Sequence, residues 1–114
     1  VKKDRLKHAQ LAHLKYGCHI LLKGADTLVV TSQDVFQVST GTSALAKAGS
    51  GDVLLGMIAA FYAQTQNAEQ AAILGAYIHG IASQEWLKEK KDYLSMRPLD
   101  LIDQLPKTLF KLRR

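Results

Sequence analysis

Ala48-Gly49-Ser50-Gly51-Asp52, followed at once by the apolar run of residues 53–58, is the stretch around which the whole chain is interpreted. Its two glycines allow a turn that brings backbone N–H groups close to a ligand. From Gly51 onward, apolar residues recur at the spacing of one helical face, which predicts a helix over residues 51–64. A glycine-rich turn that opens a helix is an anion site in outline, because unpaired N–H groups and about half a unit of positive charge gather there.

Asp52 would stand in the first turn of that helix, where a carboxylate could take a proton from a substrate hydroxyl beside the anion. A structural interpretation is also open, because Ser50 is a good N-cap and Asp52 is favoured at a helix start without any catalysis. The turn lacks the Lys-Ser/Thr ending of a P-loop and the third glycine of a dinucleotide fingerprint. Those two motifs are therefore disfavoured, and capping and anion binding remain as alternatives.

The 114 residues suffice for one domain with a modest core, and a hydrophobic content of 47% with 22% charged residues indicates a globular chain. No apolar run approaches the roughly 18 residues of a membrane span, and the first residues do not resemble a signal peptide. The single cysteine, Cys18, excludes an internal disulfide and fits a reducing cytoplasm. Because Cys18 leads an apolar stretch, we expect a buried structural thiol.

The net charge of +5 raises the possibility of a nucleic-acid partner, but much of the charge lies near the two ends of the chain. No interleaving of basic and aromatic residues and no zinc-ligand spacing accompanies it. We therefore expect solvated helix faces and no nucleic-acid or membrane partner, although a basic surface would also suit an anionic nucleotide. The terminal charges are Lys2, Lys3, Arg5, Lys7, Lys107, Lys111, Arg113 and Arg114.

Three short strands are predicted after a first helix over residues 3–16. Residues 18–23, 27–31 and 35–38 have strand composition, and residues 24–26 are short enough to join the first two strands as a hairpin. Lys23 ends the first strand, so its ammonium must reach water or an anion. Both outcomes are open from the sequence, because a lysine stem can extend to solvent.

The rest of the chain is predicted to be a loop and helices. The loop of small residues at 39–50 is long enough to indicate a functional role or disorder. A helix over 68–89 has a face of small residues that can approach another backbone closely, with His79 packed beside it and Trp86 as an anchor. A last helix should start at Pro98, and Pro106 should kink or restart it.

Three motifs occur in order: Lys23-Gly24-Ala25-Asp26-Thr27 after a strand, Ser39-Thr40-Gly41, and Ala48-Gly49-Ser50-Gly51-Asp52-Val53-Leu54 at a helix start. Together they resemble the bacterial ADP-dependent NAD(P)H-hydrate dehydratases of the ribokinase-like superfamily. Residues 74–80, and Asp100-Leu101-Ile102 before Pro106, are similar to the same family. The likeness extends over most of this chain but over only the C-terminal half of the family's domain.

The resemblance implies an α/β fold, doubly wound and of three layers (α/β/α). Residues 1–114 would be a C-terminal portion of that single domain, with about three strands and three to four helices. The absence of an initiator methionine fits such a fragment. The missing N-terminal half is then an expected partner, and we also expect a homo-oligomer.

The activity that the resemblance implies is the repair of hydrated NADH or NADPH: ADP or ATP phosphorylates the ring hydroxyl, and phosphate leaves as the ring is restored. By position, Asp52 would meet the hydrated substrate and act as general base. Mg²⁺ is implied on the phosphates, and no residue of this chain is assigned to the metal. The residues expected to hold the nucleotide are Lys23, Gly24, Ala25, Asp26, Thr27 and Gly51, and those expected to form an anion hole are Gly49, Ser50 and Gly51.

The turn departs from the family's common Gly-Gly-Thr-Gly-Asp, because Ala48 and Ser50 stand for the first glycine and the threonine. Ser50 keeps the hydroxyl, and Ala48 is harmless unless its φ is positive. Two other functions are open: a ribokinase-like small-molecule kinase that uses Asp52 in the same way, and a non-catalytic nucleotide-binding or oligomerisation module. The Lys-Gly-Ala-x-Thr segment favours the dehydratase.

Overall fold

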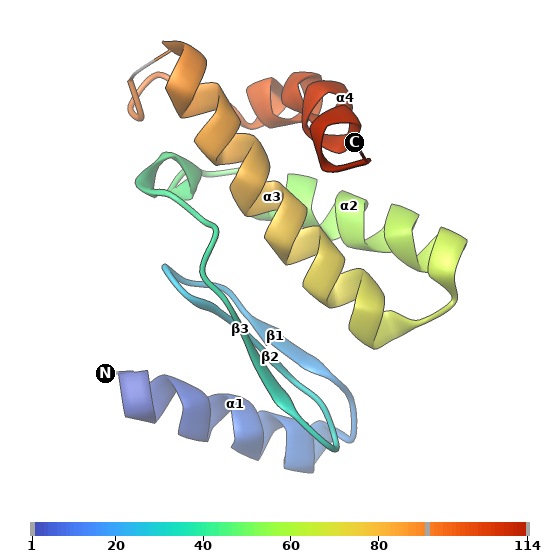
Figure 1. The fold of residues 1–114 in the computed structure, drawn as a ribbon. Coiled ribbons are helices and arrows are strands. Elements are labelled where there is room, and N and C mark those ends of the chain that lie inside the picture. The colour runs from blue at the N-terminus through green and yellow to red at the C-terminus, as the bar shows by residue number, and fades with distance from the viewer. Residues whose placement is uncertain (1, 91, 114) are drawn as a thin grey trace.

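The computed structural model describes residues 2–90 and 92–113 of the chain and shows the α/β fold that was expected (Figure 1). Its described part has three strands, four α-helices and one short 3₁₀ helix. In chain order these are α1 (Lys2–Tyr16), β1 (Ile20–Leu22), β2 (Thr27–Val30), β3 (Val35–Val38), η1 (Ser43–Leu45), α2 (Ser50–Thr65), α3 (Ala68–Lys90) and α4 (Pro98–Arg113). Among the described residues, no helix is both long and apolar enough to cross a bilayer.

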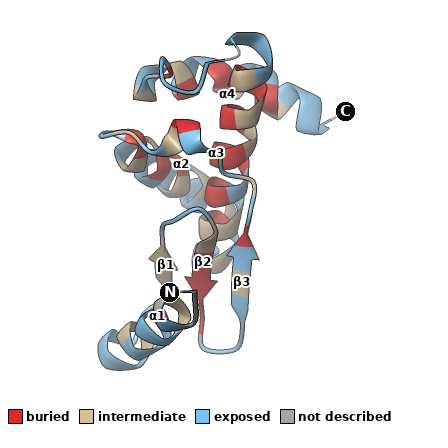
Figure 2. Cartoon of the chain, turned by 90° about the vertical axis from the view of Figure 1, so that its left-hand side faces the viewer, coloured by how far each residue is buried: buried red, intermediate tan, exposed pale blue. Residues whose placement is uncertain are grey.

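The sheet is an antiparallel meander in the order β1-β2-β3. Thr27 to Val30 pair with Val38 to Val35 of β3, Leu28 to Val30 also pair with β1, and the expected hairpin joins β1 to β2. β2 is the most buried strand, since Leu28, Val29 and Val30 are all inside (Figure 2). The described part therefore contains only the antiparallel strands of the expected α/β sheet.

Helices cover both faces of the meander, which gives the three layers. α1 contacts β1 and β2 from one side, and α3 contacts β2 and β3 from the other (Figure 1). α2 and α4 both pack on α3 and lie on the same side of the sheet. The loop after β3 runs from the sheet to the start of α2, so it connects the strands that follow Lys23 to the glycine turn.

The small-residue face of α3 is confirmed as a surface of close backbone approach. A Cβ atom on Gly75 would lie 2.5 Å from Ile58 Cγ1 of α2. A Cβ atom on Gly80 would lie 2.6 Å from the carbonyl carbon of Thr40 and 2.7 Å from the backbone nitrogen of Gly41. Glycine is required at both positions because any side chain would displace a neighbouring element.

Trp86 is confirmed as a core residue at the other end of α3. It is 7% exposed and packs with Ala44 of η1, with Met96, and with Leu101 of α4. This cluster joins the loop after β3, the C-terminal half of α3 and the start of α4 around one apolar centre. The start of α4 is also capped, because the Asp100 carboxylate accepts a hydrogen bond from the Arg97 backbone N–H at 2.7 Å.

The expectation for Cys18 is wrong, and one of the two alternatives for Pro106 is excluded. α4 continues through Pro106, so the helix does not restart there. Pro106 removes the hydrogen bond to the Ile102 carbonyl, and Ile102 is 46% exposed. Cys18 is exposed and not buried, because β1 begins only at Ile20 and Cys18 belongs to the turn that follows α1.

Candidate nucleotide-binding site

The start of α2 has the geometry of a helix that is open at its positive end. Gly49 is the N-cap residue with a φ of 93°, a left-handed conformation that favours glycine. No side chain caps this end, so the expectation that Ser50 is the N-cap is wrong. Ser50 is instead the first helical residue, and its hydroxyl is buried next to α3. Gln66 is the single non-glycine residue with positive φ in the described part of the chain. Ala48 therefore has a negative φ, and alanine is tolerated in place of the family's glycine.

The residues of the expected anion hole differ in whether their backbone N–H groups are already hydrogen-bonded. The Ser50 N–H donates to the Lys47 carbonyl at 3.2 Å, and the Asp52 N–H donates to the Gly49 carbonyl at 3.1 Å. The Gly51 N–H donates to no acceptor in the part of the chain that the structure describes. Gly51 therefore offers an open donor to an anion, whereas the Ser50 N–H is already used in the turn.

Lys23 and Gly51 meet at this helix start. A Cβ atom on Gly51 would lie 2.7 Å from Lys23 Nζ, so a side chain at this position would displace the end of the lysine from the helix start. Lys23 is exposed, as expected if its side chain extends to solvent. Its ammonium nevertheless lies against the start of α2. An ammonium beside the positive end of a helix is electrostatically unfavourable unless an anion lies between them.

A pocket of about 480 Å³ opens beside Lys23. The volume is in the range of sites that hold small molecules and cofactors. The hairpin contributes Lys23, Gly24, Ala25 and Thr27, which are four of the five residues expected in the Lys-Gly-Ala-Asp-Thr motif. The opposite walls come from β3, the loop around η1, α2 and α3. They are formed by Val38, Gly41, Thr42, Ser43, Leu45, Ala46, Leu54, Ala76 and His79.

Arg5 of α1 holds the hairpin that carries Lys23. Its Nη2 atom donates to the Lys23 carbonyl at 3.1 Å and to the Leu22 carbonyl at 3.4 Å. The guanidinium also lies over Gly24, where an added Cβ atom would be 2.3 Å from Arg5 Nη2. Arg5 therefore explains the glycine at position 24 and fixes the end of β1 from the far side of the sheet.

The loop from Thr40 to Thr42 is held on α3 by polar side chains. Thr40 Oγ1 donates to the Tyr77 carbonyl at 2.9 Å, and Gln84 Nε2 donates to the Thr40 carbonyl at 2.6 Å. Thr42 Oγ1 donates to Ser83 Oγ at 3.0 Å and also caps η1. The hydroxyls expected to suit oxygen anions are therefore used in part to fix the loop.

Lys47 fixes the turn from the other side. Its ammonium donates to the backbone carbonyls of Tyr93, Leu94 and Met96 at 3.3, 2.5 and 3.1 Å. Its own carbonyl accepts the Ser50 N–H, so the segment before α4 and the turn before α2 are tied through one residue. The roles of Lys47 and Arg5 could not be predicted from the sequence, because every residue has a backbone carbonyl and none marks the one that will be bound.

His79 packs behind the turn, as expected of a packed histidine. It is 3% exposed, and its Nε2 atom lies 3.1 Å from the Ser50 carbonyl oxygen and 3.5 Å from Ser50 Oγ. Burial lowers the pKa of His79 below its ordinary value, the hydrogen bond with Ser50 acts in the opposite direction, and the positive charge of Lys23 lowers the pKa further. His79 is therefore neutral at pH 7.

Asp52 is exposed in the first turn of α2, next to Gly51, and does not line the pocket. Asp26 is half-buried in the hairpin and also lies outside the lining. The structure thus brings Lys23, Gly24, Ala25 and Thr27 together around the pocket and places Gly51 beside them. Within residues 2–90 and 92–113, no group of three or more His, Cys, Asp or Glu side chains could hold a metal ion.

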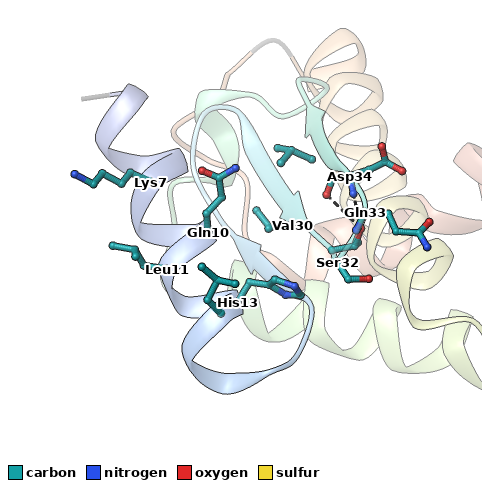
Figure 3. A pocket seen from close by; sticks show the side chains of 11 residues that line it. Lys7, Gln10, Leu11, His13, Val30, Ser32, Gln33 and Asp34 are labelled. Carbon is teal, nitrogen blue, oxygen red and sulfur yellow. Dashed lines mark hydrogen bonds between the residues drawn. The ribbon is translucent and has the colours of Figure 1, made fainter.

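A second pocket of about 530 Å³ lies between α1 and the turn that joins β2 to β3 (Figure 3). Its lining combines Leu11 and His13 of α1 with Val30 and the polar turn residues Gln33 and Asp34. Thr31 closes this turn with hydrogen bonds to Asp34. None of the residues expected in the nucleotide site lines this pocket, so it is not the candidate site.

The fold and this site define an α/β protein in which an open helix start lies beside a pocket. The family model described as NAD(P)H-hydrate dehydratase matches residues 1–107. This chain belongs to that family.

The chain is also similar to curated proteins whose names agree with this family. The bifunctional NAD(P)H-hydrate repair enzyme Nnr of Helicobacter pylori is 43% identical over 86 residues, which are 75% of this chain and 18% of that protein. The enzyme of the same name from Moorella thermoacetica is 38% identical over 110 residues, which are 96% of this chain and 21% of that protein. The chain therefore spans about a fifth of the length of these relatives.

A solved structure shows the same fold. The ADP/ATP-dependent NAD(P)H-hydrate dehydratase of Bacillus subtilis, co-crystallised with ATP and Mg²⁺, superposes with a TM-score of 0.88 at 28% identity. The superposition covers 96% of this chain and 40% of that one. The fold expectation from the sequence is confirmed by this likeness.

Proposed function

We propose that this chain supplies the nucleotide side of an NAD(P)H-hydrate dehydratase. ADP or ATP would bind with Mg²⁺ in the pocket beside Lys23, and hydrated NADH or NADPH would be dehydrated at the cost of a phosphoryl group. One observation carries the proposal: Lys23 Nζ lies against Gly51 at the positive end of α2. Two positive groups converge where an anion would bind both, and phosphate is the anion that such helix starts accept.

The residue roles follow from this placement. Lys23, Gly24, Ala25, Asp26 and Thr27 would surround the nucleotide, and the Gly51 N–H would donate to the phosphoryl group that is transferred. Gly49 shapes that turn through its left-handed backbone. Ser50 would contribute less to the anion hole, because its N–H is already bonded to Lys47.

Asp52 is the proposed general base. Its exposed carboxylate in the first turn of α2 would accept the proton of the ring hydroxyl while that oxygen attacks the terminal phosphoryl group. The phosphate ester then breaks at its carbon–oxygen bond while the neighbouring ring carbon loses a proton to water, so inorganic phosphate leaves as the ring double bond is restored. Magnesium would neutralise charge on the nucleotide phosphates.

We further infer that the rest of the site comes from outside these residues. Leu11, Leu14 and Tyr16 lie close together in the sequence of α1 and are 52%, 78% and 66% exposed. A group of exposed apolar side chains on one helix supports a contact with a further part of the protein. The remainder of the catalytic domain and self-association into a homo-oligomer are the partners that we propose for such surfaces. The exposed thiol of Cys18 suits a reducing compartment, and we place the protein in the cytoplasm.

The test is an assay of the complete enzyme that contains this segment, with hydrated NADH, ADP or ATP and magnesium. We expect recovery of NADH absorbance together with release of inorganic phosphate. Asp52→Asn should keep nucleotide binding and lose about 10²–10⁴-fold in turnover, because a positioned base supplies that factor. Accumulation of a stable phosphorylated product would instead indicate a kinase. Asp52→Asn turnover within about threefold of the parent would reduce Asp52 to a helix-stabilising residue.

A further inference from the structure

His79 contacts the helix start at Ser50, most closely at its backbone carbonyl and less closely at its hydroxyl. Its Nε2 atom is 3.1 Å from the carbonyl oxygen of Ser50, and the ring is almost fully enclosed, with 3% exposure. A carbonyl oxygen only accepts hydrogen bonds, so Nε2 must carry the proton and the neutral ring has its lone pair on Nδ1. The contact therefore determines the tautomer of His79.

The Ser50 carbonyl and the Gly51 N–H belong to the same planar peptide unit. In a trans peptide the C=O and N–H bonds point in opposite directions, so holding the carbonyl also sets the direction of the N–H. His79 holds this peptide from the α3 side, and Lys23 lies at Gly51. The open Gly51 N–H is thus oriented by a side chain that never needs to touch the anion.

A hydrogen bond to the carbonyl also polarises the peptide. Hydrogen bonds in a chain strengthen one another, by about 10–30% per bond. A donor on the Ser50 carbonyl therefore makes the Gly51 N–H a better donor to a phosphoryl oxygen. The neutral state of His79 adds no further positive charge next to Lys23.

We propose that His79 is a positioning residue of the phosphoryl-transfer site, which acts by orienting and polarising the peptide between Ser50 and Gly51. This inference deepens the proposed function and rests on it. The residue acts through the backbone and not on the substrate. Its effect should therefore be largest on turnover, where the Gly51 N–H meets developing charge, and smaller on nucleotide binding.

The experiment compares three variants of the complete enzyme. His79→Gln retains an N–H donor at a similar reach, and His79→Leu removes the donor. Ile78→Val is the matched control, because Ile78 is the neighbouring buried residue of α3 and is not within the site. We expect His79→Leu to lose about 10- to 100-fold in kcat with a smaller change in the KM for nucleotide. His79→Gln and Ile78→Val should stay within about fivefold of the parent, by the same reasoning on orientation.

Two spectroscopic measurements test the proposal independently of turnover. Imidazole ¹⁵N shifts of the parent should show a neutral ring at pH 7 with the proton on Nε2. The Gly51 amide resonance should respond to magnesium-ADP in the parent and in His79→Gln, and should respond less in His79→Leu. These readings remain valid if the parent binds nucleotide but repairs no hydrated NADH, an outcome that would refute the proposed function alone.

Three results would overturn the role of His79. The proton could reside on Nδ1, His79→Leu could keep the parent kcat and Gly51 response, or His79→Gln could lose as much kcat as His79→Leu. Circular dichroism and thermal melts of each variant separate misfolding from mispositioning. If His79→Leu does not fold, the tautomer and the kcat of His79→Gln still decide the question.

Discussion

At the level of single residues, the position of Lys23 could not be decided from the sequence and is decided by its contact with Gly51. The sequence allows its ammonium to reach either solvent or an anion, and the structure places it beside Gly51 at the start of α2. A helix start favours anions by about 0.3–1 kcal/mol and disfavours cations by a similar amount. The arrangement is therefore unfavourable when empty and becomes favourable when a phosphate bridges the two groups.

Lys23→Ala should weaken the binding of an adenine nucleotide more than it harms folding. A charge-assisted hydrogen bond contributes about 1.5–3 kcal/mol, which corresponds to roughly a tenfold or larger change in affinity. Calorimetric titration of the complete enzyme with magnesium-ADP measures the difference. Lys7→Ala, which removes the same charge from an exposed position on α1, is the control and should bind normally. Equal affinities for the Lys23→Ala variant and the parent would mean that Lys23 only extends to solvent.

At the level of elements, α3 is the organising helix of the described chain. Gly75 admits α2, Gly80 admits the loop after β3, and His79 holds the turn before the site. Glu85 binds Lys111 of α4 at 2.7 Å and Lys88 on its own helix at 3.4 Å. One helix therefore sets the positions of the loop, the turn and α4 relative to each other.

Glu85→Gln should weaken the attachment of α4 in a pH-dependent way. The hydrogen bond from Lys111 lowers the pKa of Glu85 below its ordinary value, against the opposing effect of burial. The stabilisation is therefore present at neutral pH and is lost as the pH falls below the ordinary carboxyl range and through the lowered pKa. Because Lys111 is 53% exposed, we expect no more than about 1 kcal/mol at pH 7.

Thermal unfolding of the complete enzyme at several pH values measures this difference. Glu89→Gln is the matched control, since Glu89 is more exposed and binds Lys107 at 3.4 Å, and it should change stability less. A Glu85→Gln effect that persists unchanged as the pH falls well below the lowered pKa of Glu85, where its carboxyl is protonated, would show that charge is not its cause.

At the level of the whole molecule, we propose that the described residues form one side of a site. They contain the pocket, the helix start and the proposed base, and the likeness to the Bacillus subtilis enzyme covers 40% of that chain. In open α/β sheets a ligand lies in a crevice that two parts of the sheet border. We propose further contacts for the exposed apolar side chains on α1, α2 and α4; they include Leu11, Leu14, Leu55, Tyr62, Leu99 and Leu112.

Residues 1–114 expressed alone should therefore be inactive and should need the remainder of the domain or self-association to stay in solution. The measurement is recovery of NADH absorbance from its hydrate with ADP and magnesium, with the molecular mass recorded by light scattering. Adding the separately expressed remainder of the domain is the positive control. Turnover like that of the complete enzyme from a monomer of this length would mean that the whole site lies within these residues.

The secondary structure could be predicted from the sequence because periodicity, strand composition and turn residues act over a few neighbours. Each α-helix and strand was expected close to its observed position, whereas η1 lies in the expected loop, and the hairpin at residues 24–26 was expected as such. The errors share one cause, since Ser50 as a cap and Cys18 as a buried thiol were both judged from local preference. The structure places Ser50 inside the first turn of α2 beside His79, and it places Cys18 in the turn before β1.

The sequence by itself determined the order of the elements, the glycine turn before α2 and the nucleotide motif at residues 23–27. Only the tertiary structure decided that Lys23 meets Gly51, that His79 holds the peptide before Gly51, and that Arg5 and Lys47 bind backbone carbonyls around the site. Local motifs are encoded by adjacent side chains and can be recognised in a linear chain. Contacts between distant segments, especially to carbonyl groups that every residue carries, arise only when packing brings those segments together.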